Sequence, residues 1–280
     1  MKYLITGKNG QLAQEFVRRF EKDRLDYLAL DRNALDITVA EQVNHLLDSY
    51  RPDVIINCAA YNLVDRAEED REKASLVNSL GPKMLAQAAH KRSAFLVHFS
   101  TDYVFDGTKE DGLYVEEDKP NPLNHYGMTK LAGEINIRNE TDRYLIFRVS
   151  WLYGRGKQNF IYKLLEWSKS NEYVKVAYDE FSIPTSAETV VDVAVKAIEQ
   201  RLTGLFHLTN SGFCSRYEWA KLILATLGID KFIRPVSMDT FALPAKRPKF
   251  SAMQNKKLSG RLNTDIVRWN EAVSSFVGER

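Results

Sequence analysis

Few features of this chain favour a fold held by covalent or metal cross-links. Its only cysteines are Cys58 and Cys214. Two thiols so far apart along the chain supply neither a disulfide framework nor the close spacing of a metal site. Scarce cysteine is typical of proteins in a reducing compartment, so we expect a cytoplasmic location.

One-sided charge and long apolar runs are also missing. The chain has 39 Lys and Arg against 37 Asp and Glu, a formal net charge of +2. So small an excess gives no electrostatic reason to bind nucleic acid or an acidic membrane, and we expect neither partner. No uninterrupted apolar stretch approaches the roughly 20 residues of a membrane span. The N-terminus enters an apolar run at once, so we expect no signal peptide.

The chain does have the composition of a globular protein, with 44% hydrophobic and 27% charged residues over 280 positions. That length is enough for one large domain or two modest ones, each with a buried core.

Short apolar runs alternate with helical patterns along the chain, most regularly in its first half. The runs predict strands at 2–5, 27–30, 54–58, 95–99, 144–149 and 205–208. The helical patterns lie at 12–20, 39–50, 67–90, 126–139, 160–168, 189–200 and 217–227. Thr38 is the expected N-cap of the second helix, and Gly81-Pro82 is expected to break or kink the third.

The predicted strands are continuous apolar runs, which is typical of strands buried on both faces of a parallel sheet. Alternation of such strands with helices predicts an α/β fold, a Rossmann-type doubly wound parallel sheet. We expect residues 1–150, with roughly 174–212 returning to the sheet, to form a nucleotide-binding domain. Residues 151–173 and 213–280 are expected to form a smaller, irregular substrate lobe over the carboxyl edge of the sheet, where ligands bind in such folds.

A glycine turn follows the first predicted strand, in the pattern Gly7-x-x-Gly10-x-x-Ala13. Gly7 permits a tight turn, and Gly10 lets the backbone approach a phosphate without an intervening Cβ. The helix that follows presents amide donors and a partial positive charge. The pattern predicts a dinucleotide site, although an ordinary strand–helix loop would also use these residues.

Asp31 and Arg32, which follow the second predicted strand, indicate opposite preferences between NADH and NADPH. Asp31 lies about 20 residues after Gly10, where a carboxylate binds the adenosine ribose and repels a 2′-phosphate. Arg32 beside it would pair with that phosphate. The sequence therefore predicts NADPH or NADH without choosing between them. Asp36 either binds the adenine amine or caps the following helix.

The catalytic prediction rests on Tyr126-Gly-Met-Thr-Lys130 and on Thr101 at the end of the fourth strand. Tyr126 and Lys130 are one helical turn apart and face the same side. We expect the Lys130 charge to lower the pKa of the phenol, so that Tyr126 can protonate an alkoxide, and the Lys130 amine to hold the nicotinamide ribose. The Thr101 hydroxyl would donate a hydrogen bond to the substrate oxygen.

These motifs resemble those of the extended short-chain dehydrogenase/reductase family, and within it a branch that reduces dTDP-linked sugars. The resemblance spans nearly the whole chain. It is carried by Thr6-Gly-Lys-Asn-Gly-Gln-Leu, Asn57-Cys-Ala-Ala-Tyr, Ser100-Thr-Asp-Tyr-Val-Phe-Asp-Gly107, Pro122-x-Asn-x-Tyr126-Gly-x-Thr-Lys130, Arg148-Val-Ser-Trp151-Leu-Tyr-Gly154, Pro184-Thr185 and Arg247-Pro248-x-x-Ser251.

The resemblance implies reduction of the C4 ketone of a dTDP-6-deoxyhexulose, with Thr101, Tyr126 and Lys130 as the catalytic triad. It implies contacts of Gly10, Gln11 and Leu12 with the cofactor diphosphate, of Asp36 and Ile37 with adenine, and of Ala59, Ala60 and Tyr61 with the middle of the cofactor. It places Asp102, Trp151 and Arg247 at the sugar nucleotide, although Trp151 could instead be a core residue.

Other functions remain open from the sequence. One alternative is a related sugar-nucleotide enzyme, either a reductase for another 4-keto sugar or an epimerase, which would retain its NAD through catalysis. Another is a non-catalytic regulatory subunit, like the methionine adenosyltransferase β subunit, which would keep only the nucleotide fold. Glu15 and Glu188 match glutamates that hold a metal between subunits in some family members, but surface carboxylates are the commoner case. We predict no metal site, and a homodimer is the expected assembly if the chain associates at all.

Overall fold

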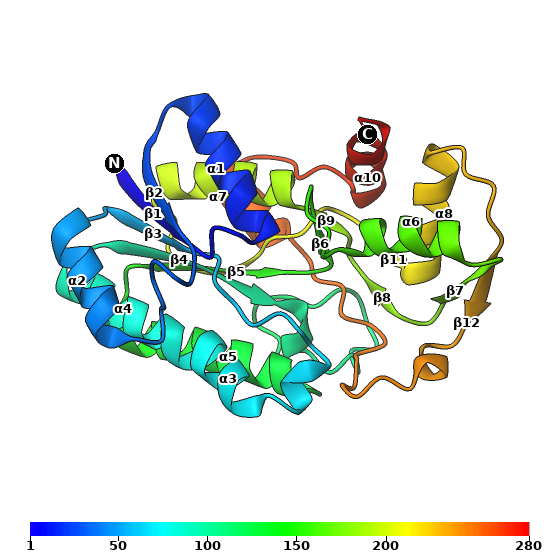
Figure 1. Ribbon diagram of the computed structural model, residues 1–280, viewed down its shortest axis with the longest axis horizontal. Helices are drawn as coiled ribbons and strands as arrows, with labels where there is room; N and C mark the ends of the chain where they lie inside the picture. The colour runs from blue at the N-terminus through cyan, green and yellow to red at the C-terminus, as the bar shows by residue number, and fades with distance from the viewer. Residues whose placement is uncertain (280) are drawn as a thin grey trace.

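The structure, a computed structural model, describes residues 1–279 and is built on a six-stranded parallel sheet (Figure 1). Its strands are β1 (Lys2–Thr6), β2 (Asp26–Leu30), β3 (Val54–Asn57), β4 (Phe95–Thr101), β5 (Tyr144–Val149) and β10 (Gly204–His207). The order across the sheet is β10-β5-β4-β3-β1-β2. Because β1 lies between β2 and β3, the winding direction reverses there, and this switch point is where ligands bind in open α/β sheets. The predicted doubly wound α/β fold is confirmed.

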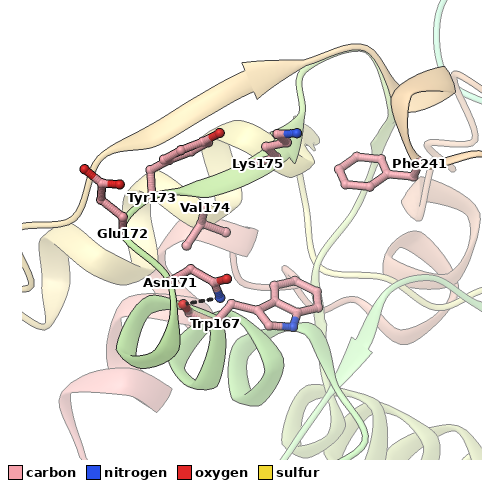
Figure 2. A pocket seen from close by; sticks show the side chains of 7 residues that line it. All are labelled: Trp167, Asn171, Glu172, Tyr173, Val174, Lys175 and Phe241. Atoms are coloured by element: carbon pink, nitrogen blue, oxygen red, sulfur yellow. Dashed lines mark hydrogen bonds between the residues drawn. The ribbon is translucent and has the colours of Figure 1, made fainter.

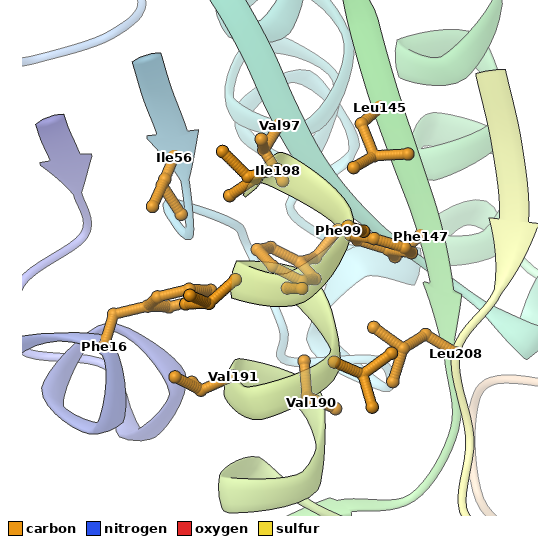
Figure 3. Close-up of a cluster of buried hydrophobic side chains, with 14 of the residues drawn as sticks. Phe16, Ile56, Val97, Phe99, Leu145, Phe147, Val190, Val191, Ile198 and Leu208 are labelled. Atoms are coloured by element: carbon orange, nitrogen blue, oxygen red, sulfur yellow. The ribbon is translucent and has the colours of Figure 1, made fainter. Parts of the chain in front are cut away.

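Helices cover both faces of the sheet. Helices α1 (Gln11–Asp23) and α7 (Ala187–Glu199) lie on one face, and α2 (Ala40–Tyr50), α4 (Gly81–Lys91) and α5 (His125–Glu140) on the other (Figure 1). Alternate strand residues enter opposite cores. Phe99 and Phe147 pack under α1 and α7 (Figure 3), whereas Leu96 and Ile146 face α2 and α4. Burial on both faces is the reason that the strands read as unbroken apolar runs.

The predicted 67–90 helix is built from four pieces. These are the 3₁₀ turn η1 (Arg66–Glu68), α3 (Arg71–Ser75), the π-helical η2 (Leu76–Leu80) and α4. Pro82 has no N–H to give the Asn78 carbonyl, and the chain widens into a π turn just before the expected break. A Cβ on Gly133 of α5 would lie 2.2 Å from the Asn78 carbonyl oxygen, so α5 packs closely on this turn.

The remaining elements form a lobe with its own core around Tyr153 and Trp219. Short strand pairs join β6 (Leu152–Tyr153) to β9 (Thr185–Ser186), β7 (Val174–Ala177) to β12 (Ile233–Val236), and β8 (Phe181–Ser182) to β11 (Cys214–Ser215). The helical elements of the lobe are α6 (Phe160–Ser170), α8 (Arg216–Thr226), η4 (Met238–Phe241) and α10 (Trp269–Gly278), whereas α9 (Lys256–Leu262) packs on the sheet side.

The two units interleave along the chain more than the sequence indicates. Strand β7 pairs with β12 in the lobe, so residues 174–182 do not return to the sheet. Conversely, Leu258 and Leu262 of α9 are buried in the cluster under α7, on the sheet side. Helices α9 and α10 lie beyond the last helix that the sequence predicts, at 217–227.

The N-cap prediction for Thr38 is wrong, because α2 begins after Val39, which has extended backbone and no side-chain cap. Thr38 instead donates from its backbone and hydroxyl to Asp36, so its side chain is already engaged one residue before the cap. No helix within residues 1–279 combines the length and apolarity of a bilayer-crossing segment.

Candidate active site

The glycine turn packs directly against the end of β3. Gly7 has a φ of +71°, and a Cβ there would lie 2.7 Å from the Ala59 backbone nitrogen. Gly10 donates a 2.8 Å hydrogen bond to the Gly7 carbonyl and is the N-cap of α1. With glycine at the cap and no acidic residue in the first turn, no side chain caps the α1 amides. The turn can therefore accept an anionic ligand.

The side chains of Gln11 and Leu12 are engaged with the protein. Gln11 Nε2 donates to the Leu152 carbonyl at 3.0 Å, and Gln11 Oε1 accepts from Asn159 at 3.4 Å. Leu12 is buried in the core under α7. Because the side chains are directed elsewhere, only the backbone amides of these two residues are candidates for a diphosphate.

The side chains of Asp31 and Arg32 make hydrogen bonds with different groups and not with each other. Asp31 accepts from the Asn33 and Ala34 amides at 3.0 and 3.1 Å, and Asn9 of the glycine turn reaches its other oxygen at 3.5 Å. Arg32 instead donates to Asp36 at 3.2 Å. The Asp31 carboxylate therefore lies beside the turn.

The Asp36 carboxylate accepts hydrogen bonds from Arg32 and Thr38, which belong to the same loop. Burial tends to raise its pKa, but hydrogen bonds from Thr38 and Arg32 outweigh burial and hold the pKa below its usual range. The carboxyl does not cap α2, which was one of its two expected roles. Ile37 is buried and contacts the Gly81 backbone, since a Cβ on Gly81 would lie 2.7 Å from Ile37 Cδ1.

A buried polar chain crosses three strands beneath the cofactor region. Thr6 Oγ1 donates to Asn57 Oδ1 at 2.6 Å, and Asn57 Nδ2 meets His98 Nδ1 at 3.0 Å. The Ala59 amide in turn donates to Thr6 Oγ1 at 3.3 Å. Burial, and then the Lys130 charge, keeps the pKa of His98 well below its usual value, so the chain is neutral. Sequence patterns missed Thr6 and His98 because such pairing needs strand register.

The π turn places Asn78 under the loop after β3. Asn78 Oδ1 accepts from the Tyr61 amide at 2.8 Å, and Nδ2 donates to the Tyr61 carbonyl and to Thr129 at 3.0 and 3.1 Å. Tyr61 Oη donates to Asp70 at 2.7 Å. Asn78 thus fixes the backbone at Ala60 and Tyr61 to the helix that carries Tyr126. No local sequence pattern identified it.

The start of α5 is positioned by Asn124 and Gly127. Asn124 is the N-cap, and its side chain accepts from the Gly127 amide at 2.8 Å. A Cβ on Gly127 would lie 2.2 Å from the Tyr103 carbonyl oxygen, so only glycine lets α5 approach the end of β4 this closely. Tyr126 is therefore held beside Tyr103, with ring centroids 6.1 Å apart, and near Thr101.

Burial raises the pKa of Tyr126 to about 12, and hydrogen bonding with Thr101 only partly opposes this. The expected lowering of the phenol pKa by Lys130 is not found. Lys130 is 2% exposed, and its Nζ donates to the Phe99 carbonyl at 2.6 Å. Burial lowers the pKa of Lys130 to about 8, with Glu134 and Cys58 opposing. Tyr126 is thus a neutral phenol at physiological pH and can give up a proton.

Asp102 does not face open space. It is 2% exposed and accepts hydrogen bonds from Thr101 at 3.2 Å, Ser182 at 2.8 Å and Ser251 at 2.6 Å. The family resemblance implies that this residue contacts the sugar. In the structure its carboxyl joins the end of β4 to two segments of the lobe.

Trp151 lies where the chain passes from the sheet to the lobe and has a positive φ of 38°. The guanidinium carbon of Arg216 lies 3.5 Å from its ring centroid, and Trp219 lies parallel to it at 5.6 Å. Arg216 is itself paired with Glu180 at 3.2 Å. Trp151 is half-buried, so it packs in the lobe without being enclosed by it.

Arg247 connects the lobe to the loop after β3. Its guanidinium makes two hydrogen bonds with the Asp65 carboxylate, at 3.0 and 2.7 Å. Beside it, Asn124 Nδ2 donates to the Lys246 carbonyl at 2.7 Å. The lobe therefore contacts the N-terminus of the catalytic helix directly.

Two hollows lie away from these residues. One, of about 380 Å³, is lined by Trp167, Asn171, Glu172, Tyr173, Val174, Lys175 and Phe241 of the lobe (Figure 2). A second, of about 480 Å³, lies beside Asn210–Gly212 and α9. Neither contains a residue of the triad or of the glycine turn, so the site is identified by its hydrogen bonds and not by these hollows.

Glu15 and Glu188 lie on α1 and α7, which pack together. Burial raises the pKa of Glu188, and the charges of Asp192 and Glu15 add to the rise. Glu15 is paired with Arg18. Residues 1–279 contain no group of three His, Cys, Asp or Glu side chains arranged to hold a metal.

Comparison with known proteins finds a family model, sequence relatives and solved structures that match along the whole chain. The sequence model of the RmlD substrate binding domain family matches residues 1–280. The dTDP-4-dehydrorhamnose reductase of Escherichia coli K12 is 33% identical over 300 residues, covering 100% of this chain and 98% of that one. The chain superimposes with a TM-score of 0.95 on two crystal structures of dTDP-4-dehydrorhamnose reductases. That from Clostridium acetobutylicum is 38% identical (99% and 98% coverage), and that from Bacillus anthracis, in complex with NADP, is 36% identical (100% and 99% coverage).

Proposed function

The chain belongs to the RmlD substrate binding domain family, and from this premise we propose that it is an NAD(P)H-dependent dTDP-4-dehydrorhamnose reductase. It reduces the C4 ketone of dTDP-4-dehydro-6-deoxy-L-mannose to dTDP-L-rhamnose, the last step of dTDP-rhamnose biosynthesis. One observation carries the proposal. A partly buried, neutral tyrosine, a buried threonine and a buried lysine meet at the carboxyl edge of the sheet, and the glycine turn follows β1, two strands away from β4.

The residues at the switch point fit a nicotinamide dinucleotide. Glycine at position 7 lets the turn pack on the Ala59 backbone, and the α1 amides have no side-chain cap, so the turn offers free donors to a diphosphate. Gly10, Gln11 and Leu12 would bind it through their backbone, and Asp31 would bind the adenosine ribose. Asp36 and Ile37 would lie at the adenine, and Ala59, Ala60 and Tyr61 along the middle of the cofactor. When bound, the cofactor supplies the hydride.

The chain's own groups supply the proton. Tyr126 is the general acid and gives its phenolic proton to the C4 oxygen as that oxygen gains negative charge. Thr101 donates a hydrogen bond to the same oxygen, which stabilises the developing alkoxide. Lys130 is held by the Phe99 carbonyl one helical turn after Tyr126, and its amine would hold the nicotinamide ribose.

The lobe supplies the substrate contacts. We place the sugar against Trp151, one face of which is occupied by Arg216. Arg247 would bind the acidic part of the sugar nucleotide in exchange for Asp65, because a guanidinium that grips a carboxylate with two hydrogen bonds can grip a phosphate in the same way.

We also propose a two-unit organisation. The nucleotide-binding unit comprises residues 1–150 with α7, β10 and α9, and the rest forms the substrate lobe. Both thiols are free, as in a reducing cytoplasm, where we place the enzyme. The sugar nucleotide is its partner, with no role for nucleic acid or membrane.

The test follows NADPH and, separately, NADH absorbance on addition of the dTDP-4-keto-6-deoxyhexose mixture made by the preceding dehydratase and epimerase. We expect oxidation, and a loss of about 10²–10⁴-fold in Tyr126→Phe, because general-acid catalysis is worth that much. Tyr178→Phe is the matched control, since Tyr178 is half exposed on the lobe. A folded wild-type protein that oxidises neither cofactor would refute the assignment.

A further inference from the structure

The buried carboxyl of Asp102 is held by three hydroxyl groups from three separate parts of the chain. Thr101 Oγ1 approaches Oδ1 at 3.2 Å, while Ser182 and Ser251 both donate to Oδ2, at 2.8 and 2.6 Å. All four residues are buried. The two oxygens of this carboxyl are therefore not equivalent, since the serines occupy one and the catalytic threonine meets the other.

Two acceptors, the Asp102 carboxylate and the substrate ketone, compete for the single hydroxyl hydrogen of Thr101. A threonine hydroxyl carries one hydrogen, whereas an ionised carboxylate and a ketone oxygen can only accept. One lone pair of Oγ1 already accepts the Tyr103 amide at 3.2 Å, which leaves the other for a second donor. While Asp102 is ionised, Thr101 gives its hydrogen to Oδ1 and has none for the substrate.

A protonated Asp102 removes this conflict. Because both serines donate to Oδ2, a proton on the carboxyl is favoured at Oδ1, the oxygen that faces Thr101. We propose that Asp102 is a positioning residue that works as a neutral carboxylic acid, donating from Oδ1 to Thr101 Oγ1 so that the threonine hydrogen is free for the substrate ketone. Ser182 and Ser251 select the oxygen that carries the proton. This inference rests on the proposed reductase function.

The surroundings permit a neutral Asp102 near physiological pH. Burial raises its pKa to about 6, against hydrogen bonds from Ser251, Ser182 and Thr101 and the charge of Arg216. Arg216 on α8 is partly neutralised by Glu180. The other titratable groups facing Asp102 are Tyr126 on α5 and Tyr103 after β4, and burial raises the pKa of both, so both are uncharged.

The acid and carboxylate forms of Asp102 predict opposite changes of activity with pH. If the acid form is productive, kcat/KM of the wild type is highest below the Asp102 pKa and falls up to about tenfold per pH unit above it. An active carboxylate form would give the opposite limb, with activity lost as the pH falls. The profile is measured with NADPH as the hydride donor, between about pH 5 and 7.5, below the pKa of Lys130.

The decisive pair of variants is Asp102→Ala and Asp102→Asn. The alanine variant removes the donor that positions the Thr101 hydroxyl, so we expect kcat to fall at least about tenfold relative to the wild type below the Asp102 pKa, and the descending limb to disappear. Asparagine has the shape of the acid. Its Nδ2 can donate to Thr101 while its Oδ1 accepts from both serines, so it should recover most of the loss and abolish the limb. An asparagine variant that binds NADPH and melts like the wild type, yet stays as inactive as alanine, overturns the proposal. So does one whose only change is a higher KM for the sugar nucleotide.

A second pair does not depend on changing Asp102 itself. Ser182→Ala and Ser251→Ala each remove a hydrogen bond that lowers the Asp102 pKa, so the descending limb should move to higher pH. Ser168→Ala is the control, since that buried serine donates only to the Leu165 carbonyl in α6. A limb that stays in place in both serine variants contradicts the inference. Failure of the reductase assignment looks different, because then the wild type itself oxidises no NADPH.

Discussion

Lys130 Nζ donates a 2.6 Å hydrogen bond to the carbonyl oxygen of Phe99, two residues before Thr101 on β4. The contact joins the catalytic helix to the catalytic strand beneath the site. The raised pKa of Tyr126 has a different cause, which is burial of the phenol itself. The triad therefore links α5 to β4, and its residues affect the stability of the fold as well as the catalytic rate.

Lys130→Met should separate these two effects. Burial lowers the pKa of Lys130 from 10.5 to about 8, a difference that corresponds to a cost of about 3 kcal/mol for the buried charge at neutral pH. The folded protein binds fewer protons than the unfolded chain between the two pKa values, so wild-type stability rises with pH there. We expect the variant to lose at least about tenfold in kcat. Denaturant unfolding should show a larger stability gain relative to wild type at pH 7 than near pH 10, and an equal difference at both would contradict this account.

Gly127→Ala tests how α5 is seated. Its Cβ would lie 2.2 Å from the Tyr103 carbonyl oxygen, a backbone atom that cannot move without shifting β4 or α5. We expect about 1–3 kcal/mol of destabilisation from overpacking and a fall in kcat, although residue 127 donates nothing to the reaction.

Gly260→Ala is the control for that variant. Gly260 lies in α9 with nothing within 4 Å of its Cβ position, so alanine there should stabilise by up to about 1 kcal/mol through helix propensity. Thermal melts and steady-state rates of both variants decide the matter. Equal behaviour of the two glycines would mean that the close contact at Gly127 is unimportant.

Gly7→Ala tests the cofactor turn. Alanine at a φ of +71° is strained, and its Cβ would also collide with the Ala59 backbone. Gly112→Ala is a matched control, because Gly112 has a φ of +70° but open space around it. Both should lose stability from strain. Only Gly7→Ala should weaken NADPH binding, by at least about tenfold, when measured by fluorescence titration of the purified proteins.

Asp31→Asn addresses the choice between cofactors. The Asp31 carboxylate lies beside the glycine turn, whereas Arg32 is paired with Asp36, so Asp31 should dominate discrimination against a 2′-phosphate. We expect the ratio of kcat/KM for NADPH to that for NADH to rise about tenfold in Asp31→Asn and to change little in Arg32→Ala. A larger effect of Arg32→Ala would assign the choice to the guanidinium.

Much of this architecture was predictable because local patterns determine it. Apolar runs gave the strands of the main sheet, and Gly7, Thr101, Tyr126 and Lys130 follow strand ends or a helical repeat that the sequence displays. Because the strands are parallel, their carboxyl ends lie at one edge of the sheet, so the sequence already predicts that these residues gather there.

The features that were missed depend on contacts between distant segments. Ser182 and Ser251 meet Asp102 only after the lobe has folded, and the pairing of β7 with β12 joins residues far apart in the chain. The role of Asn78 depends on a π turn that no periodicity indicated. The effect of burial on the pKa of Tyr126 and Lys130 needs the packed site, which is why the expected lowering of the phenol pKa was wrong.

The central claim is that hydride passes to C4 of a dTDP-linked sugar, and isotope transfer tests it most directly. The protein is incubated with NADPH carrying deuterium at nicotinamide C4, one stereoisomer at a time, and with the dTDP-4-keto-6-deoxyhexose mixture. The product is then analysed by mass spectrometry and proton NMR. We predict dTDP-L-rhamnose with one deuterium, located at sugar C4, from one of the two stereoisomers. Product without deuterium from either isomer, or a sugar epimerised with no cofactor consumed, would contradict the account.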